Sequence, residues 1–276
     1  WGLIICALSA LCIMGGIQKI GKVCTFLTPI MACIYVFFGL IILVLNIGAI
    51  PGAIGLIFKS AFSNQAAWGG ITGITIKTAI SKGVTRGIFS NEAGVGSAAM
   101  VHCGAKVDHP VEQGLWGAVE VFLDTVLVCL VSALTVVLSG LWNTGIDGAE
   151  LTMKAFEMLL PGKIGSYICL GAIILFGFSC LISFYTYAER GAVYIFGDKS
   201  RFWVKLIWIG MIFIGSQTTL GFAWDLADTI NGLMIIPNMV GVLGLFKIVK
   251  KLTKEQKELL RQLEEGIETT PKRKKF

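Results

Sequence analysis

Gly87-Ile-Phe-Ser-Asn-Glu-Ala-Gly-Val-Gly-Ser97 is the stretch that decides how this chain folds. It places the carboxylate of Glu92 and two helix-weakening glycines, Gly94 and Gly96, inside a segment apolar enough to lie in a membrane. An ionisable side chain at that depth costs about 2.5 to 3.5 kcal/mol, so it is usually buried against protein and functional. Non-helical backbone is tolerated there only where protein covers it or where it lines a cavity. The stretch therefore predicts an interrupted membrane helix with a ligand site at the interruption.

The rest of the chain also has the composition of a membrane protein. It is 55% hydrophobic and 14% charged, its mean hydropathy is +0.79, and its apolar residues form long runs between short polar loops. Most of these runs approach the roughly 20 residues that a spanning helix needs. The expected fold class is an all-α polytopic membrane protein. Its seven expected segments are residues 1–15, 25–46, 84–104, 114–139, 165–188, 203–219 and 221–246.

The Lys and Arg residues predict the orientation. If the segments alternate and the tail is cytoplasmic, 17 of the 23 Lys and Arg residues fall on the inner side. Only Lys59, Lys154 and Lys163 fall on the outer side. This asymmetry follows the positive-inside rule and predicts a multi-pass protein of the cell membrane with a cytoplasmic C-terminus.

Two regions are expected along the chain, a transporter-like membrane domain over residues 1–249 and a basic cytoplasmic tail over 250–276. The tail contains a short amphipathic pattern over 252–265, followed by lysines and one arginine. Such polybasic segments lie near anionic lipid headgroups, so membrane lipids are expected partners, with a specific protein partner as the alternative. Since topology and the tail explain the net charge of +6, no nucleic-acid partner is expected.

The eight cysteines and two histidines show no metal-binding spacing. The cysteines are interpreted as small apolar packing residues, and no cofactor is expected. The chain begins at Trp1 within an apolar run, without the basic start of a signal peptide. It is therefore expected to be the C-terminal portion of a longer protein.

Several motifs together carry a family resemblance. They occur in the order Arg86 to Ser97, His109-Pro-Val-Glu-Gln-Gly114, Phe122-Leu-Asp-Thr125, Phe178-Ser-Cys180, Tyr187-Ala-Glu-Arg190 and Ala223-Trp-Asp-Leu-Ala-Asp-Thr-Ile-Asn-Gly-Leu-Met234. This ordered set resembles the sodium:alanine symporter family of amino acid carriers, over nearly the whole chain except the charged tail. The resemblance implies a partial LeuT-like fold with two inverted five-helix repeats, in which 92–96 is the break in the first helix of the second repeat. It also implies symport of sodium, or sometimes protons, with a small neutral amino acid such as alanine or glycine.

A broken helix exposes backbone N–H groups at one half-helix and C=O groups at the other, and transporters use these ends to hold zwitterions and cations. The residues expected around the substrate are Ser90, Asn91, Glu92, Ala93, Gly94, Val95, Gly96 and Ser97. Glu92 is expected to hold the break by hydrogen bonds, or to handle a proton, because it would repel a substrate carboxylate. The alternative is that the glycines form only a close helix-packing contact.

The resemblance places Ser179 and Cys180 at the sodium site, where relatives have two hydroxyl residues. Cys180 departs from that pattern, because a thiol is a soft ligand and sodium is a hard ion. Ser183 and Phe184 are expected to face the substrate; they lie within Ser-Phe-Tyr-Thr, where relatives usually have Gly-Trp-Ser-Tyr.

Other polar residues keep alternatives open. Asp124 could serve structural hydrogen bonding or ion traffic, and Asp225 and Asp228 could cap, gate or coordinate. An intramembrane hydrolase would use Glu92, Glu120 or Asp124 as acid and base, and a non-transporting amino acid sensor is a third possibility. The preferred interpretation is a transporter and not an enzyme.

Overall fold

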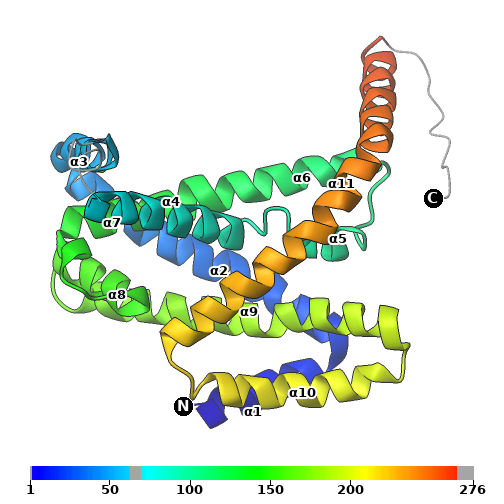
Figure 1. The fold of residues 1–276 in the computed structure, drawn as a ribbon, viewed down its shortest axis with the longest axis horizontal. Coiled ribbons are helices and arrows are strands. Elements are labelled where there is room, and N and C mark those ends of the chain that lie inside the picture. The colour runs from blue at the N-terminus through cyan, green and yellow to red at the C-terminus, as the bar shows by residue number, and fades with distance from the viewer. Residues whose placement is uncertain (1, 63–69, 266–276) are drawn as a thin grey trace. The chain divides into compact units, whose positions relative to one another are not determined.

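The computed structural model describes residues 2–62 and 70–265, and within these ranges every regular element is helical (Figure 1). The α-helices are α1 (Gly2–Met14), α2 (Gly16–Leu45), α3 (Ile50–Phe62), α4 (Gly70–Ser90), α5 (Ser97–His102), α6 (Pro110–Phe122), α7 (Leu130–Ser139), α8 (Gly148–Leu159), α9 (Ile164–Phe196), α10 (Ser200–Gly215) and α11 (Leu220–Glu264). Short 3-10 turns cover Ile47–Ala49 and Leu141–Asn143, and the π-helix Leu123–Cys129 joins α6 to α7.

Four helical stretches have the length and apolar composition to cross a bilayer, namely Gly16–Leu45, Pro110–Ser139, Ile164–Phe196 and Leu220–Gln262. Helices α1 and α10 are shorter, with 13 and 16 residues, against the roughly 20 that a span requires. These findings support an all-helical polytopic membrane protein. The count of seven segments stays a prediction.

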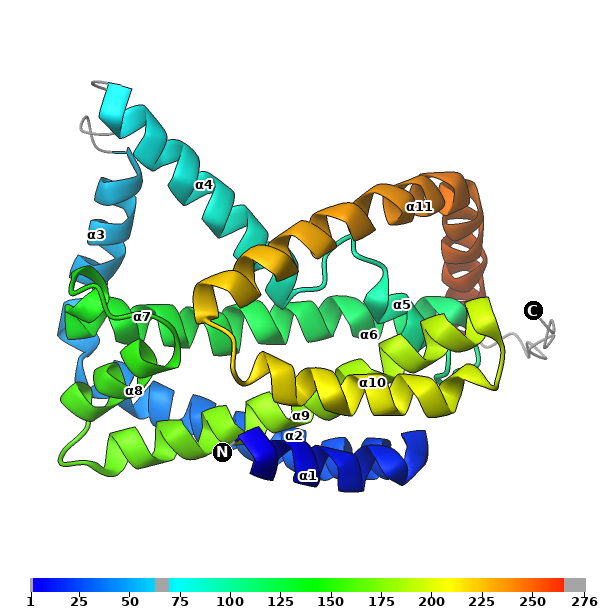
Figure 2. The ribbon, with the colours of Figure 1, turned by 60° about the horizontal axis from the view of Figure 1, so that its bottom comes forward.

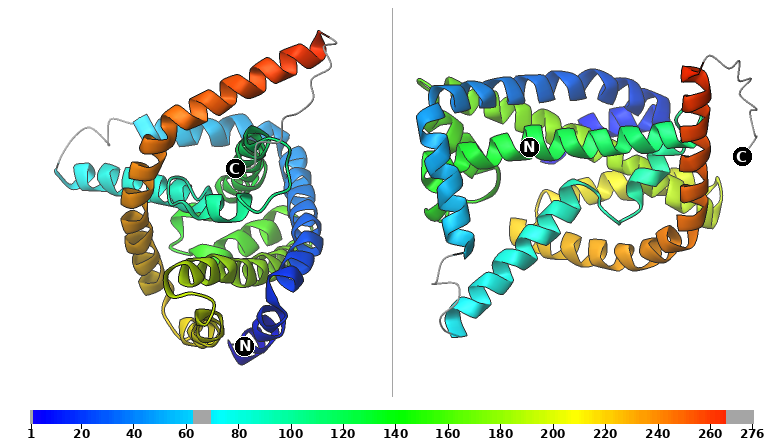
Figure 3. Two further views of the ribbon diagram at one scale, coloured as in Figure 1. Left: turned by 90° about the vertical axis from the view of Figure 1, so that its right-hand side faces the viewer. Right: turned by 90° about the horizontal axis from the view of Figure 1, so that it is seen from above.

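Several expected boundaries are wrong. Helix α2 begins at Gly16, not at residue 25, because Gly16 with φ +77° makes a tight turn directly after α1. The helix expected to start at residue 84 begins earlier, since α4 runs uninterrupted from Gly70 to Ser90. The amphipathic pattern at 252–265 is helical through Glu264, but it continues α11, whose later part turns away from its first part (Figure 3).

The chain divides into two compact units, the first formed by residues 1–84 and 124–223 and the second by 85–123 and 224–276. In the first unit α2 packs along α9, α1 lies beside α10, and α8 contacts both α7 and α9 (Figures 1 and 2). One core contains Tyr35, Phe156 and Cys169. A second core contains Ile182 and Tyr185.

The second unit contains the end of α4 from residue 85, the interruption after it, α5, α6 and most of α11. Helix α6 begins with two favourable features, Pro110 at its first position and His109 as its N-cap, whose Nδ1 accepts a hydrogen bond from Val111 N at 3.3 Å. The turn of residues 103–109 returns the chain from α5 to α6, and these two helices are in contact. The second unit therefore contains both the stretch of residues 87–97 and helix α6.

Candidate functional site

The expected helix interruption is present. Helix α4 ends at Ser90, residues 91–96 form consecutive turns, and α5 starts at Ser97 (Figure 2). Three residues of the loop have left-handed backbone, Glu92 with φ 48°, Gly94 with φ 76° and Gly96 with φ 85°. Glycine adopts this conformation freely, but for another residue it costs about 1 to 2 kcal/mol. Glu92 therefore holds a strained conformation that its surroundings must stabilise.

The Glu92 side chain closes the loop on itself. Its Oε2 accepts a hydrogen bond of 2.5 Å from Ser97 Oγ, and Ser97 is almost fully buried. Ala93 N bonds to Ile88 O at 3.0 Å, so the chain turns back over the last residues of α4. The expected hydrogen-bonding role of Glu92 is thus visible in the geometry.

Helix α11 fixes the loop from one side. Asn238 Nδ2 donates to Gly94 O at 2.8 Å. A Cβ at Gly96 would lie 2.8 Å from Asn238 Oδ1, whereas one at Gly94 would lie 3.9 Å from Met239 Sδ. Glycine is therefore needed at position 96 for two reasons. Its φ is left-handed, and Asn238 lies too close to leave space for a side chain.

A cluster of charge and aromatic rings lies one turn before the break. Arg86 Nη2 is 3.0 Å from Asp228 Oδ2, and its guanidinium carbon is 3.7 Å from the centre of the Trp224 ring. Phe89 packs edge-on against Trp224, with ring centroids 5.2 Å apart. Ten residues separate Asp228 from Asn238, about 15 Å along a helix. Helix α11 therefore contacts both the end of α4 and the loop after it.

The far end of α5 is also held by polar contacts. His102 Nε2 lies 3.3 Å from Glu120 Oε2, and His102 Nδ1 lies 2.6 Å from Gln113 Nε2. Both partners are on α6, and the ring also lies close to Gly117 between them, where a Cβ would be 3.8 Å from His102 Cε1. Glu120, named above for the hydrolase alternative, is thus engaged with a histidine and not with a second carboxylate.

The sodium-site and substrate-site residues expected on α9 belong to the first unit, not to the unit of the broken helix. Ser179 Oγ donates to Phe176 O at 2.9 Å and lies 3.8 Å from Met31 Sδ, while Cys180 is exposed. Ser183 Oγ donates to Ser179 O at 2.7 Å, and Phe184 stacks on Tyr187 with centroids 5.6 Å apart. The sodium and substrate roles of these residues stay predictions.

Asp124 lies in the first turn of the π-helix, and Cys129 Sγ is 3.8 Å from its Oδ2. Nearby, the Tyr35 and Ser132 hydroxyls are 2.6 Å apart, and Ser132 Oγ donates to Val128 O at 2.6 Å. π-Helical turns inside α-helices frequently occur at functional sites. The sequence named Asp124 but gave no sign of the π-helix.

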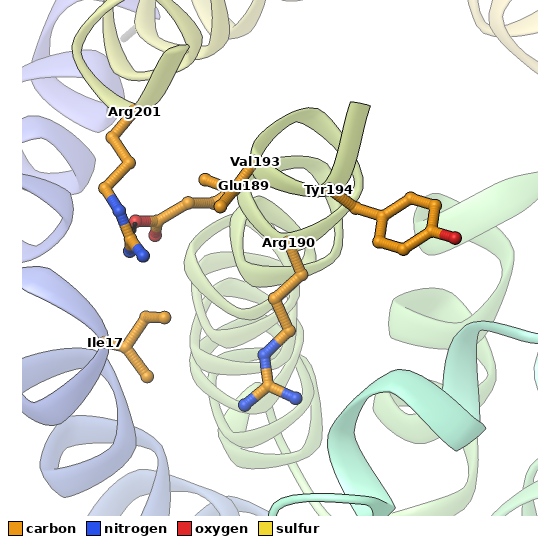
Figure 4. Close-up of a pocket in the computed structure, with 6 residues that line it drawn as sticks. All are labelled: Ile17, Glu189, Arg190, Val193, Tyr194 and Arg201. Atoms are coloured by element: carbon orange, nitrogen blue, oxygen red, sulfur yellow. Dashed lines mark hydrogen bonds and ion pairs between the residues drawn. The ribbon is translucent and has the colours of Figure 1, made fainter. Parts of the chain in front are cut away.

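A cavity of about 320 Å³ opens in the first unit where α2 begins, α9 ends and α10 begins (Figure 4). In Figure 4 the Arg201 guanidinium lies against the Glu189 carboxylate, with Ile17 facing them from α2. Arg201 bonds to Glu189 at 2.8 Å and to Asp198 at 2.9 Å. The hydrogen bonds to Asp198 and then Glu189 raise the pKa of Arg201 above its usual value. The rest of the lining consists of Ile17, Val193, Tyr194 and a second arginine, Arg190.

Comparison with known proteins identifies the family. The model of the sodium:alanine symporter family matches residues 1–272. The chain belongs to this family. It is 38% identical over 262 residues to the sodium/alanine symporter AgcS of Methanococcus maripaludis. The aligned region covers 94% of this chain and 56% of that protein.

Two other relatives are named for a different substrate or coupling ion. The sodium/proton-dependent alanine carrier protein of Bacillus sp. strain PS3 is 33% identical, covering 95% of this chain and 62% of that protein. The probable sodium/glutamine symporter GlnT of Bacillus subtilis is 34% identical, covering 93% and 54%. The chain spans about half the length of the curated relatives it matches. Since the family is one of transporters, the protein is not an enzyme, and the hydrolase alternative is set aside.

Sequence reasoning missed two features of the site. It did not find Asn238, and it did not pair Arg86 with Asp228, although it named both charges. The partners are 144 and 142 residues apart, and no spacing rule connects positions at that separation. The one available signal was that a lone arginine near the membrane needs a partner of opposite charge.

Proposed function

We propose that the complete protein is a secondary active transporter of the cell membrane that couples sodium entry to uptake of a small neutral amino acid such as alanine or glycine. The observation that carries the proposal is the interrupted helix at residues 91–96, with its three left-handed residues. Membership of the sodium:alanine symporter family supports cation-coupled amino acid symport as the class of activity.

The substrate would lie against the backbone from Ser90 to Ser97. In the last turn of α4 the carbonyl groups of Gly87, Ile88 and Phe89 accept hydrogen bonds from loop amides. A carbonyl oxygen has two lone pairs and the end of a helix is partially negative, so this turn still attracts an ammonium group or a cation. Among the turn bonds of the loop, the amides of Asn91, Glu92, Ala93 and Val95 are donors, and those of Gly94 and Gly96 are not among them. A site built from backbone near two glycines leaves room for only a small side chain, which favours alanine or glycine over glutamine.

The proposed fold is LeuT-like, with α4 and α5 as the two halves of the first helix of the second inverted repeat. In transporters of this architecture the substrate and coupling ion lie near the midplane at discontinuous helices. The proposed orientation puts the C-terminus in the cytoplasm, with the basic end of α11 near lipid headgroups. Impermeant maleimide should label Asn143→Cys but not Lys257→Cys on intact cells, and the reverse pattern would overturn the orientation.

Sodium is the proposed coupling ion. Its proposed ligands are the Ser179 hydroxyl and oxygen atoms close to Cys180. A serine hydroxyl that donates to Phe176 O still has lone pairs for a cation. The Cys180 thiol is a poor ligand for sodium, so oxygen atoms nearby would have to dominate the coordination.

The test is uptake of labelled alanine, glycine, serine and glutamine by the complete protein in proteoliposomes, with and without an inward sodium gradient. The proposal expects alanine or glycine to accumulate above equilibrium only with the gradient. Accumulation with glutamine alone would correct the substrate class. Saturable alanine binding without any flux would instead support a sensor.

A further inference from the structure

Helix α5 connects the substrate loop to a titratable pair. It has six residues, about 9 Å in length. At its first residue Ser97 donates to Glu92 in the loop, and at its last residue His102 contacts Glu120 and Gln113 of α6. A change in how α5 meets α6 therefore acts on the Glu92–Ser97 bond through one short rigid element.

The hydrogen bonds define the protonation state of the ring. A glutamine Nε2 can only donate, so with this amide orientation His102 Nδ1 must accept. The ring proton of the neutral imidazole is then on Nε2, directed at Glu120 Oε2. A second proton on Nδ1 would meet the Gln113 donor. Rotation of the Gln113 amide by half a turn replaces that donor with the Oε1 acceptor, so one side-chain flip accommodates the added proton.

The position of Glu120 favours that proton. It lies ten residues after Pro110 in the stretch Pro110–Ser139, about 15 Å along the helix. A carboxylate at membrane depth needs a compensating charge, and Asp, Glu and His chains serve as proton relays in transporters. The Glu120 side chain is 70% exposed and the His102 side chain 25%, so other chain atoms cover His102 more than Glu120.

The surrounding charges are few. Helix α6 is the element in contact with α5, and it presents Gln113 and Glu120 to the ring. The other titratable groups on α6 and in the turn of residues 103–109 are Cys103, Lys106, Asp108, His109 and Glu112. His109 is already engaged as the N-cap of α6.

We propose that His102 and Glu120 form a proton-binding site that ties α5 to α6, and that proton uptake there stabilises the loop conformation which binds the amino acid. The proton enters at His102 Nδ1, Gln113 turns its Oε1 to accept it, and the imidazolium pairs with the Glu120 carboxylate. The inference rests on the proposed function and adds a regulating ion to it. Because the protonated pair holds α5 more firmly, alanine affinity decreases when a rise in pH removes this proton.

The experiment measures alanine affinity of the complete purified protein at saturating sodium from pH 5.5 to 8.5. One linked proton changes the apparent affinity by up to about tenfold per pH unit above the pKa. We expect the dependence to vanish in His102→Gln and in Glu120→Gln. His109→Asn, which retains a good N-cap, is the matched control and should keep the wild-type profile. Gln113→Glu supplies a fixed acceptor for Nδ1–H and should move the profile to higher pH.

A second readout does not need transport. Infrared difference spectra of wild type against His102→Gln and Glu120→Gln, recorded between pH 5.5 and 8.5, should contain imidazole bands with a single midpoint. An unchanged pH profile in His102→Gln, or spectra without those bands, overturns the proton site even if sodium-driven uptake is normal. Bands without uptake of any amino acid would leave the proton site standing and refute the transport function.

Discussion

The first unit and the second unit are stabilised by different kinds of contact. In the first, α2, α8 and α9 bury Tyr35, Phe156 and Cys169 in an apolar core. In the second, the contacts around the break are polar: Glu92 to Ser97, Asn238 to Gly94, Arg86 to Asp228 and His102 to Glu120. Apolar packing gives a rigid scaffold, whereas ion pairs and hydrogen bonds can be exchanged for contacts with a ligand. We therefore expect substitutions in the first unit to reduce folding and those in the second to reduce transport.

The largest effect is expected at Gly96. In Gly96→Leu the new side chain meets Asn238 and forces a left-handed φ that leucine rarely adopts. Alanine uptake per inserted molecule should fall to background, while membrane insertion stays normal because leucine favours the bilayer. The matched control is Gly232→Leu on α11, where a Cβ meets no atom within 4 Å. Near-normal uptake in Gly96→Leu would falsify the loop as the substrate site, and a parallel loss of expression would indicate packing alone.

The opposite behaviour is expected at Phe156. This ring is fully buried on α8, 5.3 Å from the ring of Tyr35. Phe156→Ala should lower the free energy of unfolding by about 3 to 5 kcal/mol through the cavity it leaves. Thermal unfolding of the purified complete protein measures this, with Met158→Ala, at a side chain 65% exposed on the same helix, as the control. If uptake per folded molecule also collapses, the division between scaffold and site is wrong.

A smaller effect is expected at Arg86 and Asp228. Asp228→Asn leaves the guanidinium without its ionic partner, although Trp224 still covers one face. Since Arg86 is 35% and Asp228 17% exposed, solvent screening limits the coupling energy to about 1 to 2 kcal/mol. Uptake should fall about tenfold in either single variant and partly recover in Arg86→Gln with Asp228→Asn. Strict additivity in this double-mutant cycle would show that the pair does not act as a unit. Glu150→Gln, in an exposed pair with Lys154, should have no effect.

The sequence predicted the features of the two units that depend on residues close together in the chain. Gly94, Gly96 and an acidic residue within an apolar run predicted the interruption at 92–96. Patterns within one segment could not show that Asn238 bonds to Gly94, because that pairing depends on how distant helices pack. The start of α2 was missed for a related reason, since one glycine with positive φ replaced the expected loop.

The smallest effect is expected at Cys180, which tests whether residues of the first unit take part in ion binding. If the α9 residues of the first unit help to bind sodium, Cys180→Thr replaces a soft thiol with a neutral oxygen that a hard cation prefers. Apparent sodium affinity should then increase by about two- to fivefold, less than the tenfold that corresponds to about 1.4 kcal/mol. Sodium-dependent alanine uptake measures it, and Cys33→Thr, at another exposed cysteine, is the control. Unchanged sodium dependence in Cys180→Thr would remove this side chain from the ion site and leave coupling to the carbonyl groups of the broken helix, which would place both ligand and ion in the second unit.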